Sequence, residues 1–534
     1  MKTSSWVVVL AVLGPMLALS ASCASAQTLR VADRGDAANL DPHSFNETTQ
    51  LSLLGNVYES LVHRGKDGKL VPSLALSWAP TSPIEWQFQL RQNVRFHSTN
   101  PFTADDVIFS IKRAQGRGSD VRNYVDEIES VVAKGSHTVL IRLKRPIVDF
   151  PSRLSVLYIM DSAWARTAGA TEAVDRIAKN QSGAITSASG TGPYLVEKRD
   201  AGVRTVLARF RNHWSPTSTS WSSVHFIPIA NDGTRLAALL SGDVDVLTAV
   251  AVSDVQRIRS TANLSLFVTP EVRTVFFGFN TSHDTLSGRQ STAPNPLRNV
   301  LVRQAIYHSI DADAIRRVVM QGLSVPTGSL VANFVSGYTA VGATRLAFDP
   351  NRARTLLNSA GYPNGFAIDL NCPNDRYVND SRICVAIASY LAKVGIDARV
   401  VAEPRAIYFT RLAKREYSFF MLGYSPPSFD ALELVKGLLA TPDSSSGRGA
   451  FNYANLSDPV IDGLLFAAET EGDSQRRLEM TVRALNRERE LIGYMPLHQQ
   501  TVVWAARKGL TATPRSDGFF YFSEVTTEKL SAPR

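Results

Sequence analysis

The sequence predicts an α/β protein of several domains, and three observations carry this prediction. The chain has 534 residues, which is more than a single core holds, since one hydrophobic core stops growing at ~250–300 residues. Its composition, with 44% hydrophobic and 20% charged residues, is that of a globular protein without low-complexity segments. Segments typical of strands and of helices alternate through the C-terminal half, which indicates an α/β architecture.

The N-terminal segment has the pattern of a secretory signal peptide. Lys2 precedes an apolar run at residues 6–19, and small residues at 24–26 form a cleavage site. Cleavage there would release a soluble, exported protein. A lipoprotein signal that anchors the chain through Cys23 is the alternative, but Ser20 stands where that pattern requires leucine.

The formal net charge of +9 raises the question of nucleic-acid binding. The basic residues are scattered, and the longest clusters are pairs such as Arg316-Arg317 and Arg476-Arg477. A basic stripe with interleaved aromatic residues, the usual footprint of nucleic-acid binding, does not occur in the sequence. We therefore expect no nucleic-acid partner, and we attribute the charge to solubility with a mild attraction for anionic solutes or membrane surfaces.

The exported chain opens with a strand at Leu29 to Ala32 and a helix around Leu51 to Tyr58. Asn46 lies in the connection between them, and its residue type favours a turn.

Residues 68–113 carry the clearest local pattern. Apolar and polar side chains alternate over residues 86–90, which predicts a strand with one buried face. A second short strand is expected from Val94 to His97. Thr103 then begins a helix, and Asp106 completes a capping box with it.

Three shorter segments follow. The alternating residues 131–143 predict two strands that turn at Gly135. Ser189 to Tyr194 is rich in glycine, but no Lys-Ser or Lys-Thr follows and it leads into a strand, so a phosphate loop is not indicated. A helix near Leu236 to Leu240 is followed by a strand within residues 242–247.

The rest of the chain predicts a larger lobe in which strands and helices alternate. Val272 to Asn280 is an apolar strand that crosses into this lobe, and the chain returns through residues 495–498. Between them we expect a strand at Ile368 to Leu370 and helices at Leu297 to Ser309, after the capping pair Asp349-Pro350, at Asp380 to Val394, and at two places within Ser457 to Leu491.

Two cysteines, Cys372 and Cys384, remain after export. An even pair in an oxidising compartment favours a disulfide, here between the end of a strand and the start of a helix. Closing so short a loop would stabilise the fold by ~3 kcal/mol at most. Two buried free thiols are the alternative.

Four motifs follow one another along the chain: P-S-L-A-x-S-W at 72–78, W-x-F-x-L-R-x-x-V-x-F-H at 86–97, P-F-T-A-D-D-V-x-F-S at 101–110, and G-T-G-P-Y at 190–194. In this order they resemble the family 5 solute-binding proteins of bacterial ABC importers. These are the oligopeptide-, dipeptide- and nickel-binding proteins of the periplasm.

The resemblance implies a periplasmic-binding-protein-like fold of type II, with two large lobes joined by hinge strands and an extra small α+β domain. We expect lobe I to comprise 27–61, 188–273 and 496–534, the small domain 62–187, and lobe III 274–495. A monomer would enclose its solute between lobes I and III. It would then dock on a membrane permease that an ATPase drives.

In peptide-binding members of this family, an Arg pairs with the solute's carboxylate and an Asp with its amine. The resemblance places Arg376 at the carboxylate, with Tyr424 and Phe429 as aromatic walls. Pro427 stands where the peptide binders have the amine-pairing Asp. Asp430 is the nearest acid, and it is either a ligand contact or a helix cap. The resemblance also implies that the segment around Asn46 borders the cleft, so Asn46 is either a ligand contact or a turn residue.

Motifs of catalysis and of cofactor binding are missing from the sequence. It contains no G-x-S-x-G, H-E-x-x-H, Walker loop or C-x-x-C, and its nine histidines are dispersed. We therefore expect no enzymatic activity, no cofactor and no metal site. The predicted cargo is a peptide or peptide-like solute with a carboxylate. The alternatives are a metal chelate, haem or an opine-like compound, or a periplasmic hydrolase in place of a binding protein.

Overall fold

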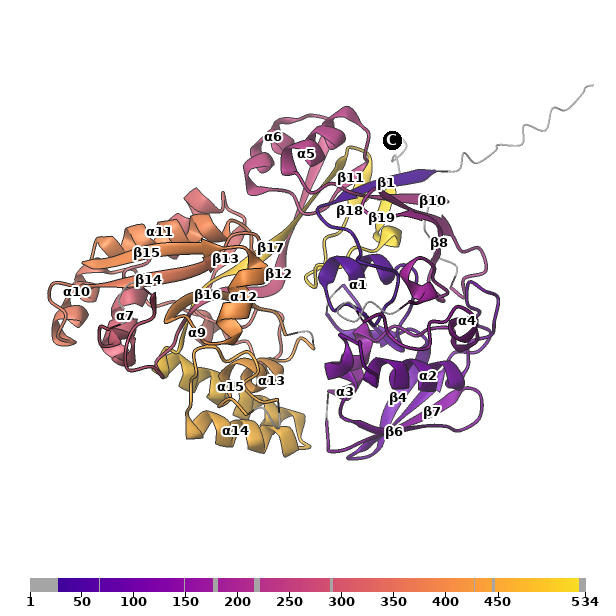
Figure 1. Cartoon of the computed structure of the whole chain (residues 1–534), viewed down its shortest axis with the longest axis horizontal. Coiled ribbons are helices and arrows are strands. Elements are labelled where there is room, and N and C mark those ends of the chain that lie inside the picture. Colours follow the sequence, from indigo (N-terminus) through magenta and orange to yellow (C-terminus); the bar gives the residue numbers. More distant parts are fainter. Residues whose placement is uncertain are drawn as a thin grey trace, which may run out of the picture.

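The computed structural model is divided into two halves that share one mixed sheet (Figure 1). Both halves combine helices and strands, which confirms the α/β class. The predicted signal peptide, Cys23 and Pro427 lie outside the described residues. The structure describes residues 27–66, 68–147, 149–175, 181–215, 221–288, 292–426, 428–443 and 447–527.

The main sheet continues from one half of the protein into the other. Two long strands, β12 and β17, connect the halves (Figure 1). The hydrogen-bonded order is β15 (Ile396–Glu403), β14 (Phe366–Pro373), β16 (Phe419–Tyr424), β12 (Leu264–Phe279), β17 (Tyr494–Arg507), β11 (Val246–Leu247), β1 (Thr28–Asp33), β10 (Ser223–Pro228), β9 (Arg204–Arg209) and β8 (Tyr194–Asp200), with β13 (Ser324–Pro326) pairing β17 off this path.

The pairing of β12 with β17 is interrupted between Pro270 and Thr274, where the register shifts. Before the shift β12 pairs with the end of β17 that also pairs β11, and after the shift it lies between β17 and β16. Such an irregularity bends a strand, so we expect the hinge between the halves here. The lobe boundary predicted at 273/274 falls at this point, and the domain boundaries themselves stay predictions.

The half that contains the first described residues, called the N-terminal half, is built around β1 and α1 (Thr48–Leu54). Glu47 caps the helix by accepting hydrogen bonds from the backbone N–H groups of Thr49 and Gln50. The helix ends at Leu54, although the sequence predicted it to continue to Tyr58. The backbone after it turns away because its carbonyl groups are taken by the glycine-rich segment.

The G-T-G-P-Y motif packs directly on this turn. The Gly192 N–H donates to the carbonyl oxygen of Val57 at 2.9 Å, and the Tyr194 N–H donates to that of Asn56 at 3.1 Å. A Cβ at Gly192 would lie 2.7 Å from the same Val57 oxygen, and a Cβ at Gly190 would also collide with Val57. Glycine is therefore required here by close backbone approach.

A separate antiparallel sheet forms the core of a small domain. Its order is β4 (Ala75–Ser82), β5 (Glu85–Leu90), β7 (Thr138–Leu143) and β6 (Ile128–Ala133). α2 (Ala104–Gln115) packs on this sheet with Val107 and Ile111 fully buried. Thr103 and Asp106 form the predicted capping box at its start.

The strand predicted from Val94 to His97 is wrong. The segment forms one isolated bridge, between Arg95 and Pro101. The Phe96 N–H donates to the carbonyl of Asn100 at 2.9 Å, so the segment folds back on itself within a few residues instead of extending beside a neighbouring strand.

The other half contains most of the helices. The helix predicted from Leu297 to Ser309 is divided, because Asn299 caps a new helix with its side-chain oxygen. Asp349 caps α10 as predicted. The helices here are α7 (Val300–His308), α8 (Ala312–Ala314), α9 (Ala340–Ala343), α10 (Pro350–Ser359), α11 (Asp380–Ala392), α12 (Arg405–Ala413), α13 (Ala431–Leu434), α14 (Pro459–Thr470) and α15 (Ser474–Leu491).

The remaining elements are short. The strand predicted within 242–247 is reduced to the two residues of β11, because Gly242 ends α5 in the left-handed region at φ 84°. These elements are β2 (Val62–Arg64), β3 (Leu70–Pro72), β18 (Leu510–Ala512), β19 (Val525–Thr527), α3 (Phe150–Arg153), α4 (Ser162–Thr167), α5 (Asp232–Ser241) and α6 (Val255–Ser260).

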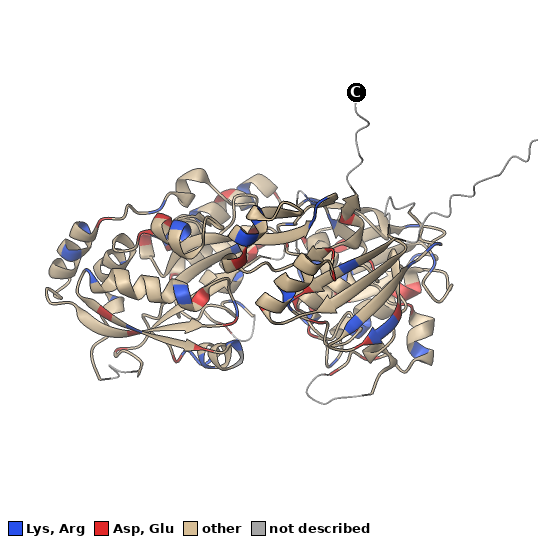
Figure 2. Cartoon of the chain, turned by 90° about the horizontal axis from the view of Figure 1, so that it is seen from above, with Lys and Arg blue, Asp and Glu red and all other residues tan. Residues whose placement is uncertain are grey.

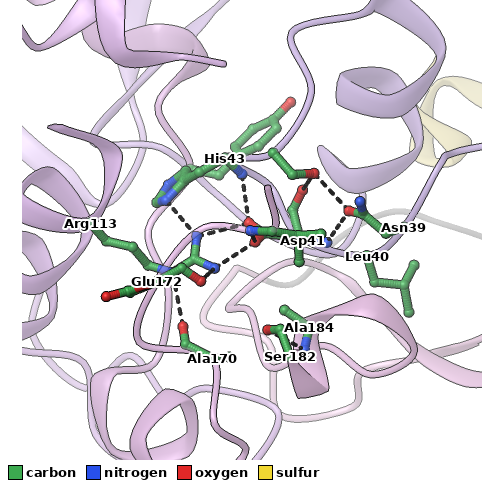
Figure 3. A network of polar contacts seen from close by, with 12 residues as sticks. Asn39, Leu40, Asp41, His43, Arg113, Ala170, Glu172, Ser182 and Ala184 are labelled. Carbon is green, nitrogen blue, oxygen red and sulfur yellow. Dashed lines mark hydrogen bonds and ion pairs between the residues drawn. The ribbon is translucent and has the colours of Figure 1, made fainter. Parts of the chain in front are cut away.

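A buried ion pair fastens the N-terminal segment to the small domain (Figure 3). Arg113 of α2 reaches Asp41 at 2.5 Å, and both side chains are fully buried. Arg113 also donates to the ring Nδ1 of His43, whose Nε2 contacts the Tyr158 carbonyl at 2.9 Å. Since the guanidinium only donates and the carbonyl only accepts, Nε2 carries the imidazole proton. Burial and Arg113 lower the pKa of His43 to about 4, so the ring is neutral at pH 7.

The two halves touch beside the small domain. The guanidinium carbon of Arg64 lies 4.5 Å from the ring centroid of Phe429. Arg64 and the Ser152 hydroxyl both donate to the Ser428 carbonyl, at 3.2 and 3.1 Å. A rotation that separates the halves about β12 and β17 would break these contacts.

Charged residues are distributed over both halves (Figure 2). Basic and acidic residues are interspersed in both halves, in keeping with the scattered pattern of the sequence. Within the described ranges, helices long and apolar enough to cross a membrane are not found.

Candidate functional site

A cavity of about 440 Å³ lies between the two halves, at the strands that connect them. Three groups of residues line it. One belongs to the N-terminal half, one to β12 and β17, and one to the loop after β14. These groups include Asp33, Glu47–Thr49 and Thr248–Ser253; Glu271, Arg273 and Gln500–Trp504; and Asn374–Arg382.

The loop after β14 is fixed so that it presents Arg376 to this cavity. Asp380, the first residue of α11, accepts hydrogen bonds from the backbone N–H groups of Arg376 and Tyr377 at 2.9 and 3.0 Å. The Tyr377 hydroxyl in turn accepts from the Gly423 N–H at 2.8 Å. A Cβ at Gly423 would lie 2.7 Å from the Tyr377 ring and 3.1 Å from Cδ of Arg273, so glycine lets both side chains pack there.

Arg376 has an unusual electrostatic position. Among the described residues its guanidinium forms no hydrogen bond or ion pair, and it lies 5.4 Å from the ring centroid of Tyr377. Burial and the nearby positive charge of Arg273 lower the pKa of Arg376. A partly buried cation next to another cation is stabilised when an anion enters.

A second charged pair lies at the register shift of β12. Nη1 of Arg273 is 3.0 Å from Oε1 of Glu271, and the two side chains are 15% and 10% exposed. The other carboxylate oxygen of Glu271 accepts from Nε2 of Gln500 at 2.6 Å. The side-chain oxygen of Gln500 accepts from the Val378 N–H at 3.2 Å, which ties the loop of Arg376 to the connecting strands.

The other carboxylates that line the cavity already hold protein groups. They cap helices, fix turns or pair with another arginine, and no ion pair joins them to Arg376 among the described residues. These contacts are Asp33 with the Gly35 N–H at 2.8 Å, Glu47 with the Thr49 N–H at 2.8 Å, Asp232 with Arg235 at 2.5 Å, and Asp375 with the Arg405 N–H at 2.6 Å.

Of the predicted ligand residues, Arg376 lines the cavity and the other four do not. The side-chain amide of Asn46 donates to the Tyr124 hydroxyl at 3.2 Å. Tyr424, at the end of β16, is half-buried with its ring 5.7 Å from that of Phe451. Their predicted contacts to a ligand therefore stay predictions.

Phe429 and Asp430 have structural partners. Phe429 is buried under Arg64 at the contact between the halves. Asp430 caps α13 by accepting from the Leu432 N–H at 2.9 Å, and its other oxygen lies 3.1 Å from Arg477. This is the helix-cap interpretation that the sequence offered for Asp430.

Glu271 and Arg273 were not predicted from the sequence. The strand at 272–280 was predicted from its Val and Phe residues, and the charged residues at its start were not used. An E-x-R pair at the beginning of the apolar segment 272–280, where the chain crosses between lobes, is the signal that could have identified them, because buried charged residues are uncommon. Clusters of three or more His, Cys, Asp or Glu that could hold a metal ion are not found among the described residues.

The sulfur atoms of Cys372 and Cys384 are joined in a disulfide, with the two Cα atoms 6.7 Å apart. The bridge links the end of β14 to the first turns of α11. It therefore closes the base of the loop that carries Arg376.

We expect the exported protein to contain no free thiol. Alkylation without reductant, followed by intact-mass measurement, should add no label, and reduction in denaturant should expose two thiols. Reduction should also destabilise the fold by ~3 kcal/mol at most, the value for a short loop. Two labelled cysteines in unreduced, periplasmically expressed protein would contradict the bridge.

The chain matches the family model described as bacterial extracellular solute-binding proteins, family 5 Middle, over residues 69–446. It is 25% identical over 511 residues to the glutathione-binding protein GsiB of Escherichia coli strain K12, covering 94% of this chain and 95% of GsiB.

Two solved structures are similar over 94% of the chain. One is the ABC transporter-associated periplasmic binding protein DppA of Helicobacter pylori in complex with the peptide STSA, at TM-score 0.75 and 23% identity, with 98% of DppA covered. The other is NikA of Brucella suis in complex with Fe(III)-EDTA, at TM-score 0.80 and 22% identity, with 100% covered. At these identities the structures establish a shared fold.

Proposed function

The chain belongs to the family 5 bacterial extracellular solute-binding proteins, the binding components of ABC importers, and from that premise we propose that it captures a small peptide or peptide-like solute with a carboxylate. Capture takes place in the cavity between the halves. The halves close on the solute and deliver it to the membrane permease.

The observation that carries this proposal is the position of Arg376. It lines the cavity between the halves, is partly buried, and has no anionic partner among the described residues. A guanidinium binds a carboxylate through two parallel hydrogen bonds. A carboxylate that enters the cavity would supply the direct ion pair that Arg376 lacks among the described residues.

Closure follows from where the contacts lie. Residues of both halves line the cavity, and the register shift of β12 lies between them. A solute that touches both halves binds the closed state better than the open one, so binding shifts the population towards closure.

The names of the relatives support a peptide-like cargo. GsiB is named for glutathione, and the Helicobacter pylori DppA structure contains a peptide. The Brucella suis NikA structure holds a metal chelate, which keeps a chelate as the alternative cargo of the same fold. We propose a non-enzymatic, exported monomer whose partners are the permease and its ATPase.

The test is to identify the solute that remains bound through purification, by native mass spectrometry of protein expressed in the periplasm. Calorimetry with that compound and with its C-terminal amide then isolates the carboxylate. We expect the amide to bind at least tenfold more weakly. Equal affinity for acid and amide would refute the role of Arg376, and a co-purified metal chelate would refute the peptide cargo.

A further inference from the structure

Arg273 lines the same cavity as Arg376 and is positioned to bind a second anionic group. It lies on β12 at the register shift, and its side chain is 15% exposed. Nη1 contacts Glu271, and among the described residues this is the ion pair that the guanidinium forms. An arginine presents five N–H donors on two edges, so one edge of Arg273 remains available to a ligand.

The contacts of Glu271 allow Arg273 to bind Glu271 and a solute at the same time. Glu271 accepts a hydrogen bond from Gln500 at 2.6 Å through the carboxylate oxygen that does not contact Arg273. The Gln499 amide also donates to the backbone carbonyl of Glu271 at 2.8 Å, which fixes the strand at this point. Glu271 therefore remains hydrogen-bonded if Arg273 turns part of its donor set towards a solute.

The cavity is also lined by Arg34, Arg382 and several carboxylates, but the charges of Arg273, Arg376 and Glu271 indicate what binds at the place where β12 meets the loop of Arg376. Arg273 and Arg376 carry two positive charges, and Glu271 carries one negative charge. The sum of +1 is neutralised by a solute of net charge −1. A peptide with an α-ammonium has that charge when it carries two carboxylates, whereas an ordinary dipeptide leaves one positive charge uncompensated in a partly buried site.

Resting on the proposed function, we infer that the solute carries two carboxylates, one bound by Arg376 and the other by the free edge of Arg273. Arg273 is then the residue that selects acidic peptides over neutral ones. Arg273 lies on the connecting strand β12. A solute that binds Arg376 with one carboxylate and Arg273 with the other therefore bridges the loop of Arg376 and the hinge.

The test uses tripeptides in matched pairs: Glu-Ala-Ala, Ala-Glu-Ala and Ala-Ala-Glu against the same peptides with Gln. Each pair has one shape and differs by one carboxylate. Calorimetry should find at least one Glu peptide that binds about tenfold tighter or more than its Gln counterpart. If the affinities of the Glu and Gln peptides agree within twofold in all three pairs, the inference is overturned.

Variants of Arg273 then assign the effect. Arg273→Gln should abolish the difference in affinity between Glu and Gln peptides. Arg273→Lys keeps the positive charge and should retain part of this difference, which serves as a control for misfolding of the Gln variant. In both variants the C-terminal acid should still bind more tightly than its amide, because Arg376 is intact. A Glu preference that survives Arg273→Gln in folded protein would overturn the assignment. Loss of the acid-over-amide difference in the wild type would instead refute the proposed function.

Discussion

Arg376→Gln is expected to weaken binding of a carboxylate solute by about 10- to 150-fold. A hydrogen bond to a charged group contributes ~1.5–3 kcal/mol, and 1.4 kcal/mol corresponds to about tenfold in affinity. Glutamine keeps a polar side chain in the cavity but removes the charge and the paired donors. Calorimetry with the co-purified solute measures the loss.

Arg382→Gln is the matched control, because Arg382 lines the same cavity but is exposed. An exposed charge is screened by water and contributes little, so we expect Arg382→Gln to weaken binding by less than about twofold. If the two variants lose the same affinity, the effect is one of overall charge and Arg376 is not the specific partner of the carboxylate.

Asp41→Asn is expected to destabilise the protein by about 3–5 kcal/mol, the usual cost of removing one partner from a buried ion pair. The substitution keeps the shape of the side chain but leaves Arg113 charged and buried (Figure 3). Burial alone would raise the pKa of Asp41, but Arg113 lowers it below the ordinary value. The stabilisation is therefore present above pH ~4 and is lost as the pH falls through the folded-state pKa. Urea unfolding at pH 7 and at lower pH measures both effects.

The control is Asp126→Asn in the small domain, which also contains Arg113, the partner of Asp41. Asp126 pairs with Arg122 at 2.8 Å, and the two side chains are 48% and 60% exposed. Exposed pairs of this kind contribute less than about 1 kcal/mol. Equal destabilisation by the two variants would show that burial does not govern the Asp41 pair.

The parts of the fold that depend on local pattern could be predicted from the sequence. The capping box of Thr103 and Asp106 and the cap at Asp349 were predicted because a cap needs only residues close in sequence. Two predictions were wrong: the continuation of the first helix beyond Leu54 and the strand at 94–97. After Leu54, the distant glycine-rich segment takes the backbone hydrogen bonds, and at 94–97 a local turn takes them. Such competition is not visible in a short window of sequence.

The candidate site was predicted in part. The resemblance placed Arg376 at the solute's carboxylate, a role that stays a prediction. The structure places Arg376 at the cavity, where Asp380 fixes its backbone. Arg273 comes from a strand more than a hundred positions earlier, and its place beside Arg376 depends on how β12, β14 and β16 are ordered in the sheet. Periodicity identifies a strand but not its neighbours in the sheet.

The role of the connecting strands can be tested by the shape of the protein in solution. Small-angle scattering of ligand-free protein and of protein saturated with its co-purified solute measures the separation of the halves. Cleft closure predicts a smaller radius of gyration and a shorter maximum dimension in the saturated sample. Identical scattering curves from a saturated and an empty sample would contradict capture by closure.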